Sequence, residues 1–174
     1  LPDGIEYLCS YISENNILNI LEIGTAIGYS AIKMALVNNK IHITTIERDE
    51  ERYQIALANI KKFNLEARIK VILGDAKEVD VMGNYDLIFI DAAKGGSIAF
   101  FEKFKTNLAT NGVIITDNLS FHGLVENESL AVTKNQKGLV KRIKKFISFL
   151  DENEEFKTNY IAVGDKISIS KRKN

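Results

Sequence analysis

Short apolar segments alternate with longer amphipathic segments along the chain, and this alternation most limits the folds open to it. The amphipathic segments 49–63 and 137–150 carry apolar side chains at helical spacing, and so do the opening residues from Ile5 to Ile12. The apolar segments have the length and β-branched content of buried parallel strands: 18–23, 41–46, 68–73, 85–90 and 112–116. This alternation predicts an α/β fold, with a mostly parallel sheet and helices on both faces.

The end of the chain departs from the alternation. Two further strand-like segments, 156–163 and 166–170, flank a turn at Gly164 and Asp165. A link this short predicts a hairpin, so the last strand should run antiparallel to its neighbours. With 174 residues, no internal repeat and no flexible linker, the chain is expected to form a single domain over residues 1–174 with a seven-stranded sheet.

Charge and cysteine content exclude several classes of protein. The 23 basic and 23 acidic side chains balance, so contact with a nucleic acid would need a local basic patch. A single cysteine, Cys9, excludes an internal disulfide framework and a cysteine-based zinc site, and it suits a cytoplasmic location. No apolar run approaches the roughly 20 residues that span a bilayer, so no membrane partner is expected.

The first three expected strands end in residues that suit a bound adenosine. The first strand runs into a turn containing Gly24 and Gly28, which lets a ligand approach the backbone closely. Glu47 ends the second strand, where a carboxylate can accept hydrogen bonds from both ribose hydroxyls. Asp75 and Ala76 follow the third, where a carboxylate beside a small residue can read the adenine amino edge.

The spacing of the glycines separates this turn from two common nucleotide-binding motifs. The pattern is G-x-x-x-G rather than G-x-G-x-x-G, which argues against an NAD-dependent oxidoreductase. No lysine followed by serine or threonine completes a P-loop. The glycines alone are equally compatible with a simple tight turn. Three matched strand ends together favour a nucleoside cofactor without phosphates.

Polar side chains also follow the fourth and fifth expected strands. Asp91 follows segment 85–90, while Asp117 and Asn118 follow segment 112–116. If these strands are neighbours, their ends lie about 4.8 Å apart. Oxygen ligands of this kind suit Mg²⁺ or another divalent cation, whereas zinc would call for Cys or His. Each residue alone is more simply explained as a cap or turn, but the three together favour a metal site.

Three further residues with side chains that can transfer protons lie near these strand ends or within a strand. Lys94 lies three positions after Asp91, and a cation beside an ammonium disfavours its protonated form. Lys94 is therefore a candidate general base, although an isolated loop lysine is usually just solvated. His122 follows the metal pair and stays without an assigned role, and His42 inside a strand pattern is expected to be structural.

The motifs LEIGTAIGYSA, TIERD, GDA, IFIDAAK and TDN occur in this order along the chain. Together they resemble the cation-dependent class I O-methyltransferases, which include catechol and caffeoyl-CoA enzymes. The resemblance runs from Leu18 to Ser170, nearly the whole chain. It implies a Rossmann-like methyltransferase fold, S-adenosylmethionine as methyl donor, and a homodimer. Family members carry a segment upstream of the position of Leu1, so that segment is expected to be missing here.

The same resemblance implies a role for each matched residue. Near the donor it implies Glu47 on the ribose, Gly24 and Ser30 at the methionine end, and Asp75 with Ala76 at the adenine. It implies that Asp91, Asp117 and Asn118 hold the metal, Asp91 also lying against the cofactor, and that Lys94 assists Asp91 in catalysis by deprotonating the substrate. The chain departs from the family at Gly95-Gly96 and at Lys166, where the final hairpin usually reads Gly-Asp-Gly.

Within the family, TIERD, FIDAAKG and DNLSFHG look closest to bacterial tRNA 5-hydroxyuridine methyltransferases. This implies methylation of the wobble base to 5-methoxyuridine, with the anticodon stem-loop as partner. A basic run between residues 134 and 145 could track RNA phosphates, although a solvated helix face is the more usual explanation of such a run. The alternatives are an O-methyltransferase of small catechol-like or phenolic substrates, and a non-catalytic RNA-binding module.

Overall fold

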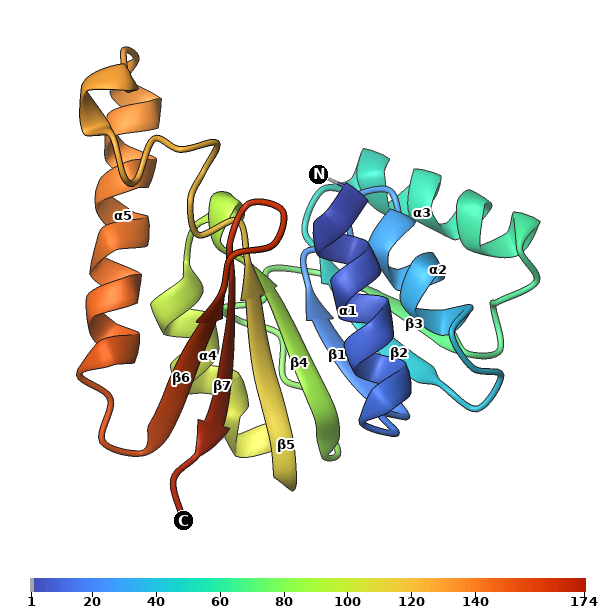
Figure 1. Ribbon diagram of the computed structural model, residues 1–174. Coiled ribbons are helices and arrows are strands. Elements are labelled where there is room, and N and C mark those ends of the chain that lie inside the picture. Colours follow the sequence, from blue (N-terminus) through green and yellow to red (C-terminus); the bar gives the residue numbers. More distant parts are fainter. Residues whose placement is uncertain (1) are drawn as a thin grey trace.

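The computed structural model describes residues 2–174, with side chains from Gly4 onward. Within this range one seven-stranded sheet has the order β3-β2-β1-β4-β5-β7-β6 (Figure 1). The strands are β1 (Asn19–Ile23), β2 (His42–Glu47), β3 (Ile69–Leu73), β4 (Tyr85–Asp91), β5 (Leu108–Asp117), β6 (Phe156–Ile161) and β7 (Ile167–Arg172). The first five are parallel, and β7 runs antiparallel to both β5 and β6. The predicted fold class and the antiparallel C-terminal hairpin are confirmed.

Helices cover both faces of the sheet, as predicted. They are α1 (Pro2–Glu14), α2 (Tyr29–Ala35), α3 (Glu50–Lys62), α4 (Ser97–Phe104) and α5 (Lys134–Asp151), with short 3₁₀ turns η1 (Ala92–Lys94), η2 (Lys105–Asn107) and η3 (Glu128–Leu130). Ile12 of α1, Met34 of α2 and Ile60 of α3 belong to the core on one face. Phe101 of α4 and Phe146 of α5 belong to the core on the other face. No helix within residues 2–174 combines the length and apolar character that crossing a bilayer requires.

Two elements begin earlier than the sequence pattern predicts. β5 begins at Leu108 rather than at residue 112. α5 begins at Lys134 rather than at residue 137, because Thr133 and Gln136 form a capping box at its start. Asp49 caps the start of α3, since its carboxylate accepts a hydrogen bond from the Arg52 backbone N–H at 2.9 Å.

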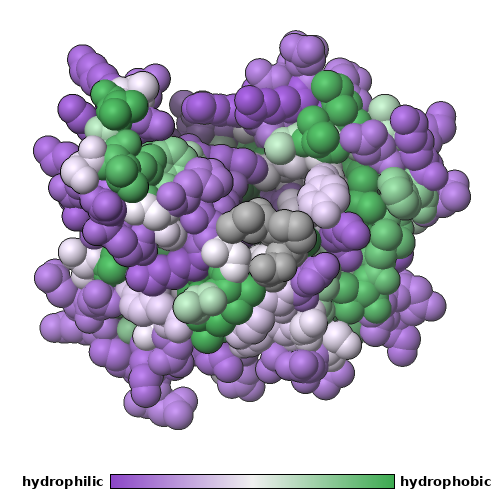
Figure 2. All heavy atoms as spheres, turned by 45° about the horizontal axis from the view of Figure 1, so that its top comes forward, coloured by the Kyte–Doolittle hydropathy of each residue, from purple (hydrophilic) through white to green (hydrophobic). Residues whose placement is uncertain are grey.

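The parallel topology gathers the ends of five strands at one edge of the sheet. In the register of β1 with β2, Ile23 pairs with Ile46, so the glycine turn after β1 lies beside Glu47. In the register of β4 with β5, Asp91 pairs with Asp117. Figure 2 shows this edge from outside, where the surface is hollowed between the α5 side and the α3 side and its rim is mostly hydrophilic. Ligands bind at this edge in open α/β sheets.

Candidate functional site

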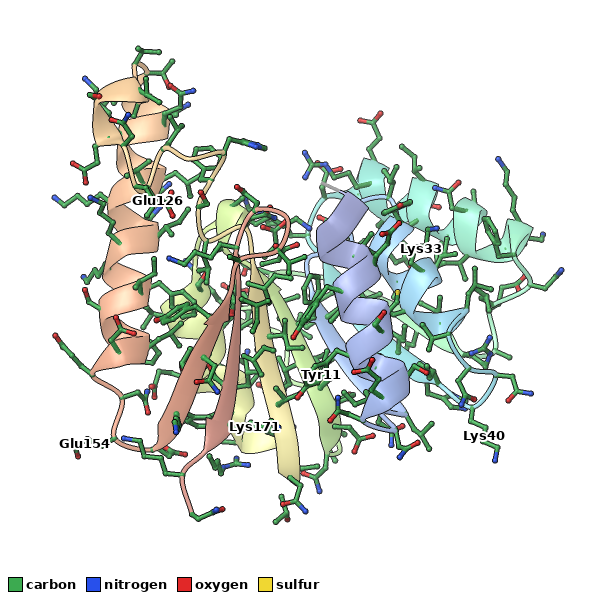
Figure 3. All side chains as sticks on the ribbon, viewed as in Figure 1. Tyr11, Lys33, Lys40, Glu126, Glu154 and Lys171 are labelled. Carbon is green, nitrogen blue, oxygen red and sulfur yellow. The ribbon has the colours of Figure 1, made fainter. Side chains whose placement is uncertain are left out.

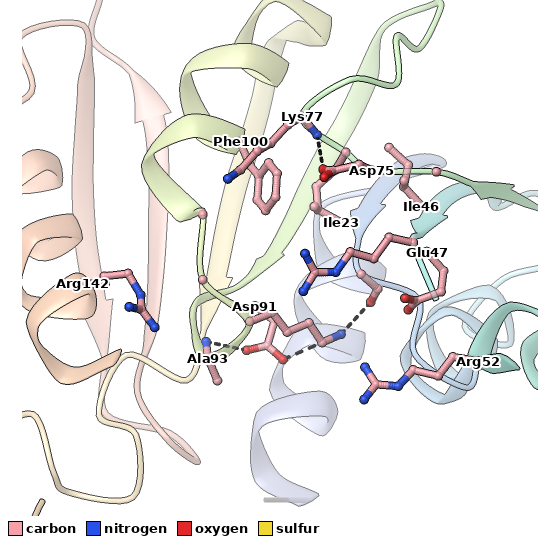
Figure 4. A pocket seen from close by; sticks show the side chains of 17 residues that line it. Ile23, Ile46, Glu47, Arg52, Asp75, Lys77, Asp91, Ala93, Phe100 and Arg142 are labelled. Carbon is pink, nitrogen blue, oxygen red and sulfur yellow. Dashed lines mark hydrogen bonds and ion pairs between the residues drawn. The ribbon is translucent and has the colours of Figure 1, made fainter. Parts of the chain in front are cut away.

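A cavity of about 590 Å³ opens at the carboxyl edge of the strands (Figure 4). Its volume lies within the range of small-molecule sites. The lining includes six of the predicted site residues: Gly24, Glu47, Asp75, Ala76, Asp91 and Lys94. Ser30, Asp117 and Asn118 do not line it. The cavity therefore brings the predicted donor residues other than Ser30 together with one carboxylate of the predicted metal set, Asp91.

Gly24 and Lys94 meet on one wall of the cavity. The Lys94 ammonium donates a hydrogen bond to the Gly24 carbonyl oxygen at 2.8 Å, and it lies 3.9 Å from a carboxylate oxygen of Asp91. Gly24 has a φ of +95°, and a Cβ there would lie only 2.8 Å from Lys94 Cδ. Glycine suits this position, because any side chain would be strained at this φ and would push the end of Lys94 aside. Lys94 thus joins the end of β1 to Asp91.

Glu47 is held rigidly in the wall beside the glycine turn. One carboxylate oxygen accepts a hydrogen bond from the Ala26 N–H at 2.7 Å, and the other accepts one from the Asp49 N–H at 3.0 Å. The side chain is buried. A carboxylate has about four acceptor positions, so Glu47 keeps capacity to accept hydroxyls from a ligand in the cavity.

Asp75 and Ala76, the residues predicted to contact an adenine, line the cavity just after β3, the strand beside β2. One oxygen of Asp75 accepts a hydrogen bond from the Lys77 N–H at 2.9 Å, which fixes the carboxylate (Figure 4). Gly74 precedes them, and a Cβ there would lie 2.5 Å from a methyl carbon of Val79. Gly74 therefore lets the chain pass close to Val79 as it turns along the cavity wall.

Behind the glycine turn lies a buried polar network that the sequence analysis missed. Glu22 is fully buried and accepts hydrogen bonds from the hydroxyls of Ser30 and Thr45. Thr45 is bonded in turn to Thr25, with 2.6 Å between the hydroxyl oxygens. Burial raises the pKa of Glu22 above its ordinary value. Glu22, a charged residue inside an apolar strand, was the signal in the sequence for this network. Ser30 belongs to the network and does not line the cavity.

The three predicted metal ligands are brought together. The Asn118 side-chain amide donates a hydrogen bond to an oxygen of Asp91 at 2.8 Å. The Asn118 backbone N–H donates to Asp117 at 2.6 Å. Asp91 and Asp117 face each other as register partners of β4 and β5. Their proximity is a consequence of strand pairing, which the sequence analysis assumed and the sheet order confirms.

The charges at this trio fit a hard divalent cation. Burial raises the pKa of Asp117, the Asn118 backbone hydrogen bond opposes this, and the negative charge of Asp91 adds to it. A cation beside both carboxylates would offset the burial and the repulsion. In residues 2–174 no group of three or more His, Cys, Asp or Glu side chains is arranged to hold a metal. A cation held at this trio would therefore take Asn118 as its third ligand, with the amide oxygen turned toward it.

Arginines were the lining residues that sequence reasoning overlooked. Arg48 follows β2, Arg52 lies on α3, and Arg142 reaches the cavity from α5 (Figure 4). Among the ion pairs of the described side chains, none involves these three residues. Their positive charges are thus left to face the cavity and solvent. Arg142 was visible in the sequence only as part of the basic run.

Two histidines lie away from the cavity wall. His122 is exposed, and its backbone N–H donates a hydrogen bond to Asp165 at 2.8 Å. His42 begins β2, at the end of the strand opposite the cavity. A second hollow lies near that opposite end, where Tyr11 of α1 and Lys171 of β7 contribute to the wall (Figure 3). None of the predicted site residues lines this second hollow.

Comparison with known proteins gives one consistent result. A model of the O-methyltransferase family matches residues 2–173. A caffeoyl-CoA O-methyltransferase from Stellaria longipes is 29% identical over 161 residues, which cover 87% of this chain and 67% of the relative. A crystal structure from Staphylococcus aureus, provisionally assigned as a caffeoyl-CoA O-methyltransferase, has a TM-score of 0.93 and 37% identity, covering 98% of this chain and 83% of the other.

A second solved structure carries the spent form of the methyl donor. The O-methyltransferase from Bacillus cereus in complex with S-adenosylhomocysteine has a TM-score of 0.81 and 27% identity. The match covers 98% of this chain and 80% of that one. The fold, the cavity at the strand ends and the family match agree. This chain therefore belongs to the O-methyltransferase family, whose members transfer a methyl group from S-adenosylmethionine to an oxygen.

Proposed function

We propose that the chain methylates an oxygen of a substrate that carries two neighbouring oxygens and is held by a divalent cation. The wobble 5-hydroxyuridine of tRNA is the substrate we favour, and 5-methoxyuridine is the product. The observation that carries the proposal is the trio of Asp91, Asp117 and Asn118, joined through Asp91 and Lys94 to the wall of the cavity. In 5-hydroxyuracil the 5-oxygen and the 4-oxygen form the same bidentate pair as a catechol.

The donor site is proposed from the residues that line the cavity. When bound, S-adenosylmethionine supplies the electrophilic methyl group. Glu47 accepts hydrogen bonds from the ribose hydroxyls, since the backbone already fixes its two oxygens in the wall. Asp75 and Ala76 contact the adenine, and Gly24 leaves the methionine end room beside Lys94. Ser30 acts at that end from the buried network, through Glu22.

The residues beside the donor prepare the acceptor oxygen. A divalent cation, when bound, lowers the pKa of a coordinated hydroxyl and so favours the oxyanion. Asp91, Asp117 and Asn118 would hold it. Lys94 would first release one proton to solvent, which a cation beside it favours, and its neutral amine would then leave the Gly24 carbonyl and receive the substrate proton at Nζ. Positioning both reactants at attack distance then provides much of the rate acceleration.

A basic hollow on α5 supports an RNA substrate. Lys134, Lys137, Lys141 and Arg142 line this hollow, and Arg142 also lines the donor cavity. A cationic track from the helix surface to the reaction site suits a strand whose phosphates continue beyond the modified base. The second candidate is a small catechol-like or phenolic acceptor, which the caffeoyl-CoA relative favours. A homodimer is proposed from the family resemblance, and sedimentation equilibrium would test it.

Transfer of labelled methyl groups tests the chemistry. The wild type with Mg²⁺ should methylate an anticodon stem-loop containing 5-hydroxyuridine, and EDTA should stop the reaction. Asp117→Ala should abolish turnover, because one of two carboxylate ligands is lost, while affinity for S-adenosylhomocysteine stays near wild type by calorimetry. Full activity of Asp117→Ala in EDTA would refute the metal role.

A parallel assay decides between the two substrates. The same preparation is offered catechol in place of the stem-loop, at matched enzyme and donor concentrations. Methylation of catechol without methylation of RNA would replace the tRNA proposal by the small-substrate one. Nucleoside mass spectrometry of tRNA from a deletion strain extends the test to the cell. Loss of 5-methoxyuridine with accumulation of 5-hydroxyuridine is the expected result.

A further inference from the structure

The loop that follows the metal ligands has an unfavourable backbone. Asn118, Phe121 and His122 have φ values of 63°, 48° and 57°, in the left-handed region that side chains other than glycine rarely adopt. Asparagine and histidine adopt this region more readily than other side chains, so Phe121 is the most strained of the three, and such a backbone persists only where surrounding contacts impose it. The loop therefore needs ties to a more rigid part of the fold. Asn118 is both the first residue of this loop and a proposed metal ligand.

The hairpin turn between β6 and β7 supplies those ties. Leu119 N–H donates a hydrogen bond to the Lys166 carbonyl at 3.1 Å, and Ser120 N–H donates to the Asp165 carbonyl at 2.9 Å. His122 N–H donates to the Asp165 carboxylate at 2.8 Å. The last bond is the only one of the three that depends on a side chain. From this loop the Ser120 hydroxyl also donates a hydrogen bond to Glu126 at 2.7 Å.

The Asp165 carboxylate is an unusual group for a hairpin turn. The residue is only 6% exposed, although it lies in a short link between two strands. One of its carboxylate oxygens has no hydrogen-bond partner among the described side chains and backbone. A buried carboxylate oxygen without a partner costs free energy, so the turn by itself is not stabilised by this choice of residue. The hydrogen bond from the His122 N–H is the contact that this carboxylate makes to the loop.

We propose that Asp165 is a positioning residue, which holds the loop 118–122 so that Asn118 stays against Asp91 and thereby sets the affinity for the divalent cation. The inference rests on the proposed metal site. The chain of contacts runs from Asp165 to the His122 N–H, through the loop backbone to Asn118, and from the Asn118 amide to Asp91. Losing the first contact lets the left-handed residues relax, and the amide of Asn118 then leaves Asp91.

Three variants at position 165 separate the hydrogen bond from the charge. Asp165→Ala removes both. Asp165→Asn keeps an acceptor oxygen at the same place without the charge. Asp165→Glu keeps the charge but moves the carboxylate by one methylene away from the His122 N–H. Asp86→Ala is the matched structural control, because Asp86 also accepts backbone hydrogen bonds, from Leu18 and Asn19 at 3.0 and 2.9 Å, but at the opposite end of the sheet.

Three quantities are measured for each variant. Hydrogen-exchange mass spectrometry reports the protection of the loop peptide without any metal. Calorimetry with Mn²⁺ as the probe reports cation affinity, and calorimetry with S-adenosylhomocysteine reports the donor site. Asp165→Ala and Asp165→Glu should speed exchange in the loop and weaken Mn²⁺ binding by about tenfold. Asp165→Asn should stay within about threefold of wild type. Asp86→Ala should leave Mn²⁺ binding unchanged, and donor affinity should hold throughout.

Several outcomes would overturn the proposal. Unchanged loop exchange in Asp165→Ala would show that the carboxylate does not hold the loop. If Asp165→Asn weakens Mn²⁺ binding and Asp165→Glu does not, the charge of Asp165 rather than its hydrogen bond is responsible. If Asp165→Ala does not fold, the Asn and Glu variants decide alone. Absence of Mn²⁺ binding by the wild type would refute the proposed metal site itself. Hydrogen exchange of the loop would then test separately whether Asp165 holds the loop 118–122.

Discussion

Gly24 is the single residue on which the contact between β1 and Lys94 depends. Its positive φ strains any side chain, and an added Cβ would push the end of Lys94 aside. Gly83 offers a matched comparison, because its φ is also positive, at +99°, but an added Cβ would meet nothing within 4 Å. The two glycines share the backbone requirement and differ in what surrounds them. They therefore separate strain of the backbone from displacement of Lys94.

Gly24→Ala should lose most methyl transfer and most affinity for S-adenosylhomocysteine, because the new methyl group displaces Lys94 and narrows the donor site. Gly83→Ala should keep both. Each variant should lose about 1 kcal/mol or more of unfolding free energy, since alanine is strained at positive φ. Calorimetry and urea unfolding measure the two effects. Equal loss of donor affinity in both variants would contradict the role of Lys94 in the wall.

Glu22 makes stability depend on pH in a defined direction. Its folded-state pKa is raised above the ordinary value of 4.5 by burial. Between pH 4.5 and the raised pKa, the folded protein therefore binds more protons than the unfolded chain. Stability from this group is greatest at the acid end of that window and decreases as pH rises through it. Above the raised pKa the penalty of the buried charge is complete.

Glu22→Gln should remove this dependence, because the amide does not ionise and can still bond the two hydroxyls. The unfolding free energy of the wild type minus that of the variant should fall with rising pH from about 4.5, by at most about 1.4 kcal/mol per pH unit. Urea unfolding of both proteins at several pH values measures it. A difference that is constant with pH would contradict the prediction.

At the scale of elements, α5 joins the core to the proposed RNA surface. Val140, Ile143, Phe146 and Leu150 are its buried residues. The rest of the helix is rich in lysine, and Lys144 forms an ion pair with Glu128. Arg142 lies where the basic hollow meets the donor cavity, whereas Lys145 is exposed and lines neither. The same helix therefore provides both a test residue and a control.

Arg142→Ala should weaken binding of the stem-loop and reduce the slope of log affinity against log salt by about 0.7, the value expected for one lost contact to a single-stranded phosphate. Lys145→Ala removes the same charge from the helix and should change the slope less. Fluorescence anisotropy over a salt series measures both. Equal effects of the two substitutions would mean that the general charge of α5, rather than the position of Arg142, drives binding.

At the scale of the whole molecule, donor binding should be visible as stability. A ligand that binds only the folded state at 100 times its Kd adds about 2.7 kcal/mol to the unfolding free energy. For a chain of this size, that corresponds to about 5–10 °C in Tm. S-adenosylhomocysteine should therefore raise the Tm of the wild type by this amount. The effect arises because the cavity walls come from four strands that are adjacent only in the folded sheet.

Glu47→Gln should reduce the shift in Tm caused by S-adenosylhomocysteine by half or more, since the proposed ribose acceptor loses its charge. Glu51→Gln, on the exposed surface of α3, should keep the full shift. Differential scanning calorimetry with and without ligand measures both. An undiminished shift in Glu47→Gln would exclude Glu47 from the donor site, whatever the change in the Tm of the free protein.

Local patterns in the sequence were sufficient for the sheet and for most of the cavity. Each strand is encoded by a short apolar run, and each candidate carboxylate directly follows or ends such a run, as Glu47 and Asp91 do. Parallel strands bring their carboxyl ends to one edge, so residues at these ends converge without further information. This is why six predicted residues line the cavity and why Asp117 faces Asp91.

The sequence by itself therefore determined the strand pattern, the mixed sheet and the residues at its carboxyl edge, because these follow from periodicity and strand direction. Tertiary structure alone decided the rest. Arg142 reaches the cavity from α5, the Ser30 hydroxyl bonds Glu22, and Asp165 bonds a residue 43 positions away. Such contacts depend on how helices and turns pack across the sheet. No local pattern encodes the partner of a side chain that is distant in the chain and adjacent only after folding.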